Sequence, residues 1–551
     1  MVESTVLIGG KAGDGINRAG SIIGRLYAAC GYRIYMNYDY PSLIRGGHNF
    51  AILRASEREV ATHHDRVDYL LALDKNTLEI HKERTGPKTS IIYNSDMVKE
   101  EWPGIAVPIS TITKEAGGLP IMENSCIIGA FSKVAGFAWE TVERVLKQEI
   151  PRETGKNLAI ARGGYDAVDA GGTITPLPME TQPLVSGNEA IALGLLAAGL
   201  DAYIAYPMTP SSGILHFLAA EAGRFGIKVV HPENEIAVIL MALGSAYAGA
   251  RSAVGTSGGG FALMNEGFSM AGMTEIPLTV VVSQRGGPST GTPTYTAQGD
   301  LLFVLRAGHG EFPRFIIAPG TPAQAVEWSA RALNLSWKYQ VPAVILVDKT
   351  LSEGTYTYDP ALIDSIERIP PHWGKEGEYR RYADTLSGVS PLAVPPLKGS
   401  VIKVNSYAHD QDGYTTEQAG TVAWLHEKQM RKGRFMKEEI ESLSPVERSG
   451  VEGSSTALVS WGSNAGVARE VAENLGISAM QPVVLEPFPV DAMQSALETV
   501  EMLVAVEDNI TGQLSGLMQG YGFKVDEEIL RYDSRPFSVD ELTRRVKEMM
   551  K

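Results

Sequence analysis

The residues best suited to chemistry lie in four short segments between positions 206 and 294. The first, Tyr206–Ser212, follows an apolar run expected to form a strand and precedes an expected helix. Hydroxyl groups beside the free N–H groups of a helix start can bind a carboxylate, which would be the role of Thr209. An ordinary helix cap at Ser211 or Ser212 is the alternative, and the spacing alone leaves both interpretations open.

The second segment places a carboxylate at the start of an expected helix over residues 235–251. Alanine and glycine recur along this helix, which indicates close packing on all sides. Glu235 is therefore either a partner of the helix dipole or a buried acid–base group. Glu233 lies two residues earlier, and the composition alone does not choose between the two carboxylates.

The third and fourth segments are glycine-rich turns after expected strands. The run Gly258–Gly260 provides three successive glycines, which let a backbone or a ligand approach closely. Arg285 is the only cation of the loop 283–294, where glycines and hydroxyl side chains surround it. Its planar guanidinium could hold a carboxylate at two points; a solvated arginine at the surface is the alternative.

The elements that carry these segments alternate regularly. Short apolar runs indicate strands at 203–205, 228–231, 253–256 and 278–283, and longer patterns between them indicate helices. This alternation predicts a parallel sheet covered by helices on both faces. Ligands bind at the carboxyl edge of such sheets, so we expect Thr209, the glycine run and Arg285 to meet in one crevice.

A further glycine turn, Gly9–Gly15, lies near the N-terminus between an expected strand at 5–8 and an expected helix at 17–30. It matches neither a dinucleotide fingerprint nor a P-loop. Asp14 and Asn37 are 37 − 14 = 23 residues apart, which is short for a pair that holds Mg²⁺ with thiamine diphosphate. We therefore favour a tight turn without a metal ion. The loop Ser42–His48 is either functional or a plain connection.

The chain is expected to be an α/β protein with several parallel-sheet domains. An α/β domain is predicted over 1–175, with a linker rich in glycine, proline and threonine at 163–186. A second and most regular α/β domain covers 186–375. A connector with one amphipathic helix at 416–443 fills 376–454, and strands and helices resume in a last domain at 455–551.

The composition excludes several classes of protein. The chain has 551 residues and a net charge of −15, with 44% hydrophobic and 21% charged residues; it is neither disordered nor a basic nucleic-acid binder. Two cysteines, Cys30 and Cys126, are too few for a disulfide scaffold, a structural zinc site or an iron–sulfur cluster held by this chain alone. No signal peptide is expected, because the N-terminal sequence MVESTVLIGG lacks a basic region and a long apolar run. No membrane span is expected, because the longest apolar stretch, 236–250, is shorter than the roughly 20 residues required. We expect a cytoplasmic protein.

These motifs resemble those of the 2-oxoacid:ferredoxin oxidoreductases. The turn YPMTPSS is similar to the family's YPITP signature, with Met208 in place of isoleucine, and ENEIAVILMALGSAYAGARS and QRGGPSTGTPT also match. The order of domains resembles the fused gamma–alpha large subunit. The resemblance implies a gamma-type domain at 1–175, a pyrimidine-binding thiamine diphosphate domain at 186–375 and a transketolase C-terminal-like domain at 455–551. The turn that reads G-x-G-G-Q-G in the family has the sequence GGKAGDG in this chain, which differs from the family pattern.

The resemblance also implies roles for individual residues. Glu235 would be the catalytic glutamate that meets N1′ of the aminopyrimidine of thiamine diphosphate. Thr209, Arg285 and Thr294 would surround the carboxylate of the 2-oxoacid. No metal ligand is expected in this chain. The residues expected to contact the cofactor besides Glu235 are Tyr206, Pro207, Gly258 and Gly259.

The implied partners complete the active site. A beta subunit would carry the Mg²⁺-diphosphate motif and a 4Fe–4S cluster in an (alpha–beta)₂ hetero-oligomer, with coenzyme A as co-substrate and ferredoxin as electron acceptor. The expected reaction is oxidative decarboxylation of a 2-oxoacid, with 2-oxoglutarate favoured, to acyl-CoA and CO₂; no nucleic-acid or membrane partner is expected.

Three alternatives remain to this assignment. The chain could be a non-catalytic assembly or regulatory paralogue, although the joint presence of Glu235, Thr209 and Arg285 argues against one. It could be a member specific for pyruvate, branched-chain 2-oxoacids or indolepyruvate. It could also be a thiamine decarboxylase or transketolase-like enzyme without clusters, but such an enzyme needs a Mg²⁺-diphosphate domain that the sequence does not show.

Overall fold

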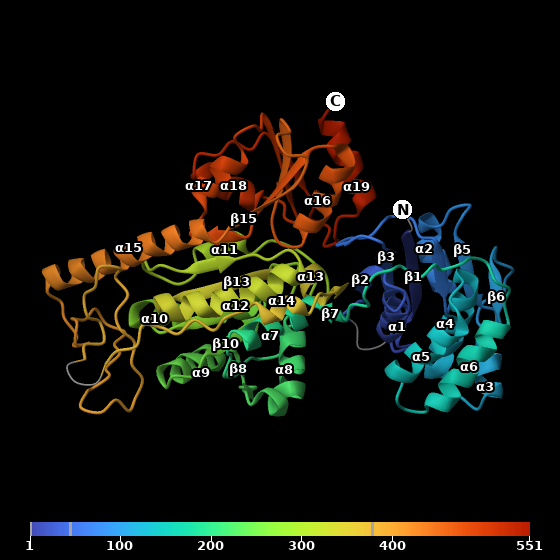
Figure 1. Ribbon diagram of the computed structural model, residues 1–551, viewed down its shortest axis with the longest axis horizontal. Helices are drawn as coiled ribbons and strands as arrows, with labels where there is room; N and C mark the ends of the chain where they lie inside the picture. Colours follow the sequence, from blue (N-terminus) through green and yellow to red (C-terminus); the bar gives the residue numbers. More distant parts are fainter. Residues whose placement is uncertain (1–2, 43–46, 376–378) are drawn as a thin grey trace. The chain divides into compact units, whose positions relative to one another are not determined.

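A computed structural model describes residues 3–42, 47–375 and 379–551 of the chain. They form two compact units, and each is built from discontinuous stretches (Figure 1). The first unit comprises residues 1–186, 353–360 and 537–547, and the second comprises 187–352, 361–536 and 548–551. In the described part of the chain, no helix is both long and apolar enough to cross a membrane.

The first unit contains an eight-stranded mixed sheet in the order β6-β5-β4-β1-β3-β2-β14-β7. Strands β1, β4, β5 and β6 are parallel, and the remaining pairs are antiparallel. The segment between β2 and β3 is too short for the crossover that a parallel pair needs, so these two strands run antiparallel. The strands are β1 (Glu3–Lys11), β2 (Arg33–Asp39), β3 (His48–Ser56), β4 (Tyr69–Ala72), β5 (Ser90–Asn94), β6 (Ile105–Val107), β7 (Leu184–Ser186) and β14 (Thr355–Thr357).

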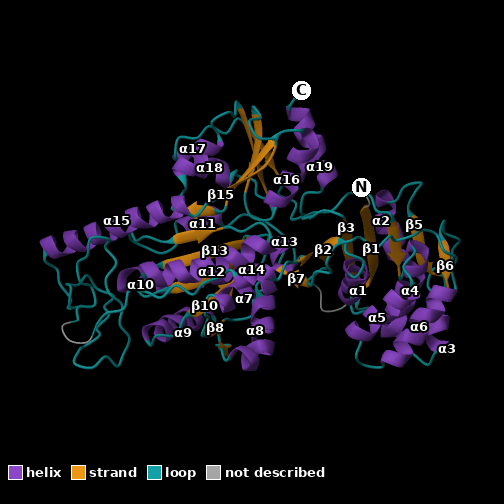
Figure 2. Cartoon of the chain, in the orientation of Figure 1, coloured by secondary structure: helices purple, strands orange, loops and turns teal. Residues whose placement is uncertain are grey.

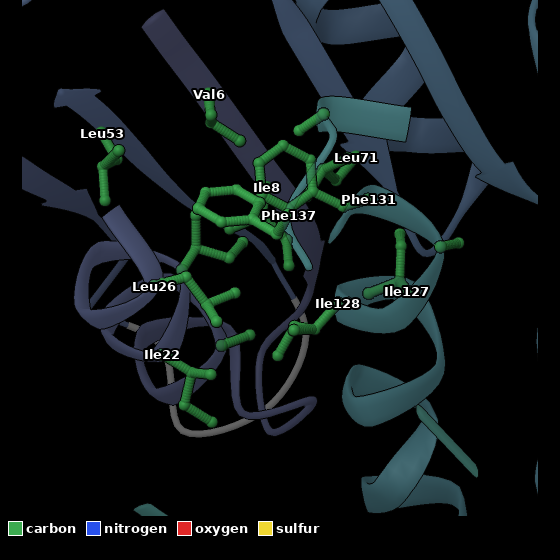
Figure 3. Close-up of a cluster of buried hydrophobic side chains, with 14 of the residues drawn as sticks. Val6, Ile8, Ile22, Leu26, Leu53, Leu71, Ile127, Ile128, Phe131 and Phe137 are labelled. Atoms are coloured by element: carbon green, nitrogen blue, oxygen red, sulfur yellow. The ribbon is translucent and has the colours of Figure 1, made fainter. Parts of the chain in front are cut away.

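Helices cover the parallel part of this sheet and bury its core. Figure 3 shows Val6 and Ile8 of β1 against Ile22 of α1 and Phe131 of α4, and all four side chains are at most 2% exposed. Helices α4 and α6 pack so closely that a Cβ at Gly129 would collide with the backbone of α6. The helices are α1 (Ile16–Ala28), α2 (Lys75–His81), α3 (Ile109–Glu115), α4 (Glu123–Ala135), α5 (Trp139–Glu149), α6 (Thr154–Asp166) and α19 (Val539–Met549).

The turn between β1 and α1 has the tight geometry expected from its glycines. Gly13 and Gly15 have φ angles of 100° and 76°, in the left-handed region that favours glycine. The Oδ2 atom of Asp14 accepts a hydrogen bond from the backbone N–H of Lys11 at 2.8 Å, and burial raises the pKa of Asp14. Asp14 thus holds the turn together. Residues 43–46 of the Ser42–His48 loop lie outside the described residues.

The second unit contains two sheets, and the larger one has the order β18-β12-β13-β11-β10-β8-β9. All its pairs are parallel except β12 with β18, which confirms the predicted parallel sheet. Its strands are β8 (Ala202–Ile204), β9 (Lys228–Val230), β10 (Ser252–Thr256), β11 (Leu278–Gln284), β12 (Phe315–Ile317), β13 (Pro342–Asp348) and β18 (Val484–Glu486). Its helices are α7 (Gly187–Ala197), α8 (Ser212–Phe225), α9 (Glu235–Tyr247), α10 (Gly258–Thr274), α11 (Leu301–Leu305), α12 (Pro322–Tyr339), α13 (Lys349–Glu353) and α14 (Ala361–Asp364).

The smaller sheet of the second unit has the order β15-β17-β16-β19-β20 and is parallel except for β15 with β17. The long helix α15 (Ala419–Ser442) precedes it, close to the predicted helix at 416–443 (Figure 2).

We retain the boundaries 1–175, 186–375, 376–454 and 455–551 as a proposal for the domains. The remaining elements are β15 (Val446–Gly450), β16 (Thr456–Ser460), β17 (Ser478–Pro482), β19 (Met502–Glu507), β20 (Glu527–Leu530), α16 (Asn464–Leu475), α17 (Val490–Ala496) and α18 (Gln513–Gly520).

A buried ion cluster fastens α15 to the end of α10. The carboxylate of Glu275, the residue after α10, is 1% exposed and lies 2.6 Å from the Nζ atom of Lys428; it also pairs with Lys432. Arg381 of the connector donates to the backbone carbonyl of Glu275 at 2.7 Å. Burial favours a neutral carboxyl, but the three cations outweigh it and hold the pKa of Glu275 well below its usual range. One carboxylate thus balances three cations from two other segments, α15 and the connector.

Candidate active site

The three turns predicted to converge do lie at one edge of the larger sheet. Strands β8, β10 and β11 are adjacent and parallel, so the residues that follow them share the carboxyl edge. The Nη1 atom of Arg285, after β11, donates to the backbone carbonyl of Thr209, after β8, at 2.9 Å. The structure therefore brings these two residues together, through the main chain of Thr209 rather than through its hydroxyl.

The structure distinguishes the two carboxylates at the start of α9. Glu235 is 4% exposed, whereas Glu233 lies in the exposed class. Asn234 caps the helix, because its Oδ1 atom accepts from the N–H of Ala237 at 3.0 Å. The cap fixes the start of the helix, and the next side chain, Glu235, is buried. Among the described residues, no donor reaches the buried Oε1 atom of Glu235.

Other polar atoms without partners surround this carboxylate. A Cβ at Gly260 would lie 2.6 Å from Oε1 of Glu235 and would collide with the hydroxyl of Thr256, so only glycine fits there. Within the described ranges, the buried hydroxyls of Thr256 and Ser257 also have no hydrogen-bond partner. An unsatisfied buried polar group costs about 1–3 kcal/mol. Such a cluster fits a ligand that both donates and accepts hydrogen bonds, such as an aminopyrimidine ring.

The remaining predicted residues differ in how far they are buried. Thr294 is 6% exposed, and its hydroxyl has no partner in the described part of the chain. Tyr206 is 37% exposed, and its ring makes a T-shaped contact with that of His231, with centroids 5.7 Å apart. Pro207 and Gly259 are exposed at their turns. These placements leave the roles of Tyr206, Pro207 and Gly259 toward a cofactor as predictions.

Asp300, which the sequence analysis did not single out, lies in this region. Its Oδ2 atom approaches Gly258 so closely that a Cβ there would collide with it. Burial raises the pKa of Asp300 to about 6, against the opposing charge of Arg285; burial likewise lowers the pKa of Arg285, which Asp300 opposes. The signal available in the sequence was a lone acid directly before the apolar run 301–305. Gly258 therefore makes room for Asp300.

A cavity of about 470 Å³ opens beside Arg285 and Asp300. Its far wall comes from the segments 508–513 and 531–535, which follow strands β19 and β20 of the smaller sheet. Gln298 holds the two walls together, since its N–H donates to the carbonyl of Asp508 at 2.7 Å and its Nε2 atom donates to the carbonyl of Trp461 at 2.8 Å. The C-terminal part of the chain therefore contributes directly to the site.

Two family models match the chain. The one described as "Pyruvate flavodoxin/ferredoxin oxidoreductase, thiamine diP-bdg" matches residues 193–428, and the one described as "Pyruvate ferredoxin/flavodoxin oxidoreductase" matches residues 5–167. The first covers all the candidate residues from Tyr206 to Asp300. The candidate site therefore lies in a thiamine diphosphate-binding domain.

Two relatives and one solved structure match the chain over nearly its full length. The chain is 31% identical to a 2-oxoacid:ferredoxin oxidoreductase subunit alpha of Sulfolobus sp, over 99% of this chain and 96% of the relative. It is 27% identical to the 2-oxoglutarate oxidoreductase subunit KorA of Mycobacterium tuberculosis, over 99% and 91%. The 2-oxoglutarate:ferredoxin oxidoreductase of Magnetococcus marinus, solved with 2-oxoglutarate, coenzyme A and succinyl-CoA bound, superposes with a TM-score of 0.93 at 28% identity over 100% of both chains.

Proposed function

Because this chain belongs to the 2-oxoacid:ferredoxin oxidoreductases as an alpha subunit, we propose that it decarboxylates 2-oxoglutarate oxidatively to succinyl-CoA and CO₂, with ferredoxin as electron acceptor. The carrying observation is the buried, unsatisfied Oε1 atom of Glu235 at the sheet edge that also holds Arg285. The 2-oxoglutarate bound in the structure from Magnetococcus marinus supports this substrate, as does the similarity to KorA subunits of a 2-oxoglutarate oxidoreductase and a 2-oxoglutarate synthase.

The residues at the sheet edge suit the aminopyrimidine half of thiamine diphosphate. Glu235 would hold a proton between its Oε1 atom and a ring nitrogen, and the hydroxyl of Thr256 would take a further hydrogen bond from or to the ring. When bound, the cofactor supplies an electron sink for decarboxylation. Contacts from Tyr206, Pro207 and Gly259 remain part of the proposal; Gly258 is already occupied on one side by Asp300.

A beta subunit would supply what this chain lacks. Cys30 and Cys126 are both buried, and two thiols do not hold a 4Fe–4S cluster. Helix α9, which begins at Glu235, leaves Ile236 and Leu240 nearly half exposed, and Leu263 of α10 is 52% exposed. Exposed apolar faces of this kind mark interaction surfaces. We propose that the subunit that brings Mg²⁺, the diphosphate site and the cluster covers this face in an (alpha–beta)₂ assembly.

The purified chain should show no turnover by itself. The assay contains thiamine diphosphate, Mg²⁺, coenzyme A, a viologen acceptor and each of several 2-oxoacids, with and without the beta subunit. Adding the subunit should produce acceptor reduction, with 2-oxoglutarate the best substrate. Turnover by the chain alone would contradict the shared active site, and an assembled complex inactive toward every 2-oxoacid would identify an assembly or regulatory paralogue instead.

Replacing Arg285 with lysine should lower kcat/KM of the assembled enzyme for its 2-oxoacid by roughly 10- to 150-fold. Lysine cannot reproduce a planar two-point contact with a carboxylate, and a lost charge-assisted hydrogen bond costs about 1.5–3 kcal/mol. The dissociation constant of thiamine diphosphate should change little. Arg306→Lys, at an exposed position outside the site, is the matched control; equal kinetics of the two variants would place Arg285 outside the substrate site.

A further inference from the structure

The cavity beside Arg285 contains one carboxyl group that neither the proposed mechanism nor a structural ion pair uses. Asp508, the residue after β19, lines the cavity and is only 3% exposed. In the described part of the chain, no donor meets hydrogen-bond geometry at either of its carboxylate oxygens. The nearby amide of Asn464 donates to Oε1 of Gln298 instead, at 2.9 Å. A buried polar group left in this way is costly unless a ligand satisfies it.

The main chain holds Asp508 firmly in place. Its carbonyl accepts from the N–H of Gln298 at 2.7 Å, and its own N–H donates to Oε1 of Gln298 at 3.2 Å. The neighbouring Asn509 donates through Nδ2 to the carbonyl of Gln298 at 3.2 Å. Gln298 belongs to the loop that also carries Arg285, so Asp508 has a fixed position relative to the wall of the active site.

The surroundings of Asp508 favour its protonated form. Burial raises its pKa well above the ordinary value, and the like charge of Asp348 adds to this, while Arg531 and the amide of Asn464 oppose it. Asp533 also raises the pKa slightly but is itself paired with Arg531. A protonated carboxyl carries an O–H donor. Asp508 can therefore donate a hydrogen bond into the cavity instead of repelling an anion.

Three guanidinium groups give this cavity a positive lining. Arg285 faces it from the active-site loop. Arg531 is held by Asp533, with N···O distances of 2.8 and 3.0 Å, and Arg535 lies over the ring of Tyr295 at 3.8 Å from its centroid. Asp300, whose pKa burial raises to about 6, also lines the cavity beside Arg285. Three guanidinium groups therefore face two carboxyl groups, and this balance, with an O–H donor at Asp508, suits a carboxylate.

We propose that this cavity receives the side-chain carboxylate of a dicarboxylic 2-oxoacid and that Asp508 donates a hydrogen bond to it. The inference rests on the proposed function, because it assumes that Arg285 binds the first carboxylate of the substrate at the mouth of the same cavity. A monocarboxylic 2-oxoacid leaves the cavity without an anion and gains nothing from Asp508. Asp508 is thus a specificity residue, contributed by the C-terminal part of the chain.

The test compares 2-oxoglutarate with pyruvate in the complex assembled with the beta subunit. Asp508→Ala should raise KM for 2-oxoglutarate by roughly 10- to 100-fold, the range of a hydrogen bond to a charged group, and should change KM for pyruvate less than about threefold. Asp508→Asn keeps a donor and should recover part of the loss. Asp364→Ala, at an exposed position, controls for assembly and should leave both substrates unaffected.

A pH profile separates binding from a structural role. As pH rises through the pKa of Asp508, the wild-type kcat/KM for 2-oxoglutarate should fall relative to that for pyruvate, because the carboxyl loses its proton and then repels the substrate. Asp508→Asn does not ionise at residue 508, so its relative fall should be smaller than that of wild type and limited to the part that ionisation of Asp300 causes. The proposal is overturned if the variants affect both substrates equally, if the fall is as large in Asp508→Asn as in wild type, or if wild type uses pyruvate but not 2-oxoglutarate. Failure of the wild-type complex with every 2-oxoacid would instead refute the proposed function.

Discussion

Glu235→Gln should slow exchange of the C2 proton of bound thiamine diphosphate by about 10²–10⁴-fold, the usual range of general acid–base catalysis. Glutamine keeps the shape of the side chain but cannot carry the proton that Oε1 would share with the aminopyrimidine. The variant should still assemble with its beta subunit and bind the cofactor, because the cap at Asn234 and the backbone of α9 do not depend on the carboxylate. Hydrogen–deuterium exchange at C2, followed by rapid quench and NMR, measures the effect.

Glu233→Gln provides the matched control. It makes the same chemical change two residues away, on a side chain that is exposed rather than buried, so its C2 exchange should equal that of wild type. A normal exchange rate in Glu235→Gln, or a larger defect in Glu233→Gln, would show that the wrong carboxylate has been assigned. Loss of cofactor binding in Glu235→Gln would point to a purely structural role.

Glu275→Gln should destabilise the second unit by about 3–5 kcal/mol at neutral pH, since it leaves buried ammonium groups without their counter-charge. Lys428 and Lys432 have side chains that are 0% and 1% exposed, and both contact this one carboxylate. We expect amide protection in α15 and at the end of α10 to fall by roughly 10²–10⁴-fold, as measured by native-state hydrogen exchange. Glu427→Gln on the exposed face of α15 should change stability by less than about 0.5 kcal/mol.

The defect should shrink as pH rises. Burial lowers the pKa of Lys432 to about 8, against the raising effect of Glu275. Removing Glu275 lowers the pKa of Lys432 in the folded variant further. Between this lowered pKa and the ordinary pKa of lysine in the unfolded chain, the unfolded variant binds more protons than the folded one. The stability of the variant therefore increases with pH over a wider range than that of wild type. The difference from wild type should therefore be larger at about pH 6.5 than at about pH 9. A constant difference would mean that lost packing, rather than charge, causes the defect; Glu275→Gln combined with Lys432→Met should restore part of the stability.

The parallel sheet and the convergence of three turns could be predicted because their signals are local. Each apolar run ends at a turn with hydroxyls, glycines or Arg285. Because parallel strands have their carboxyl ends at the same edge of the sheet, these turns lie together. The choice between Glu233 and Glu235 was out of reach, because it depends on how the cap at Asn234 directs the first turn of α9. The family resemblance favoured Glu235, and its burial agrees with that assignment.

The features that the sequence analysis missed depend on residues far apart in the chain. Asp508 reaches the site only because Gln298, 508 − 298 = 210 residues earlier, binds its backbone on both sides. The ion cluster at Glu275 joins lysines more than 150 residues away. When only the neighbouring residues in the sequence are known, a charged side chain is expected to be exposed to solvent. The sequence therefore identified neither Asp508 nor the Glu275 cluster. Strand β14 has three residues, too few to give a pattern.

The position of strand β14 in the sheet also affects how the first unit folds during synthesis. Thr355 pairs with Met36, 355 − 36 = 319 residues earlier, and it lies between β2 and β7 in the sheet. As the chain leaves the ribosome, the outer edge of β2 therefore remains unpaired until the entire segment 187–352 has been synthesised. Unpaired strand edges invite association with other chains. The nascent first unit is thus a candidate for chaperone protection throughout that interval, and the sheet can close only after the cofactor-binding segment has emerged.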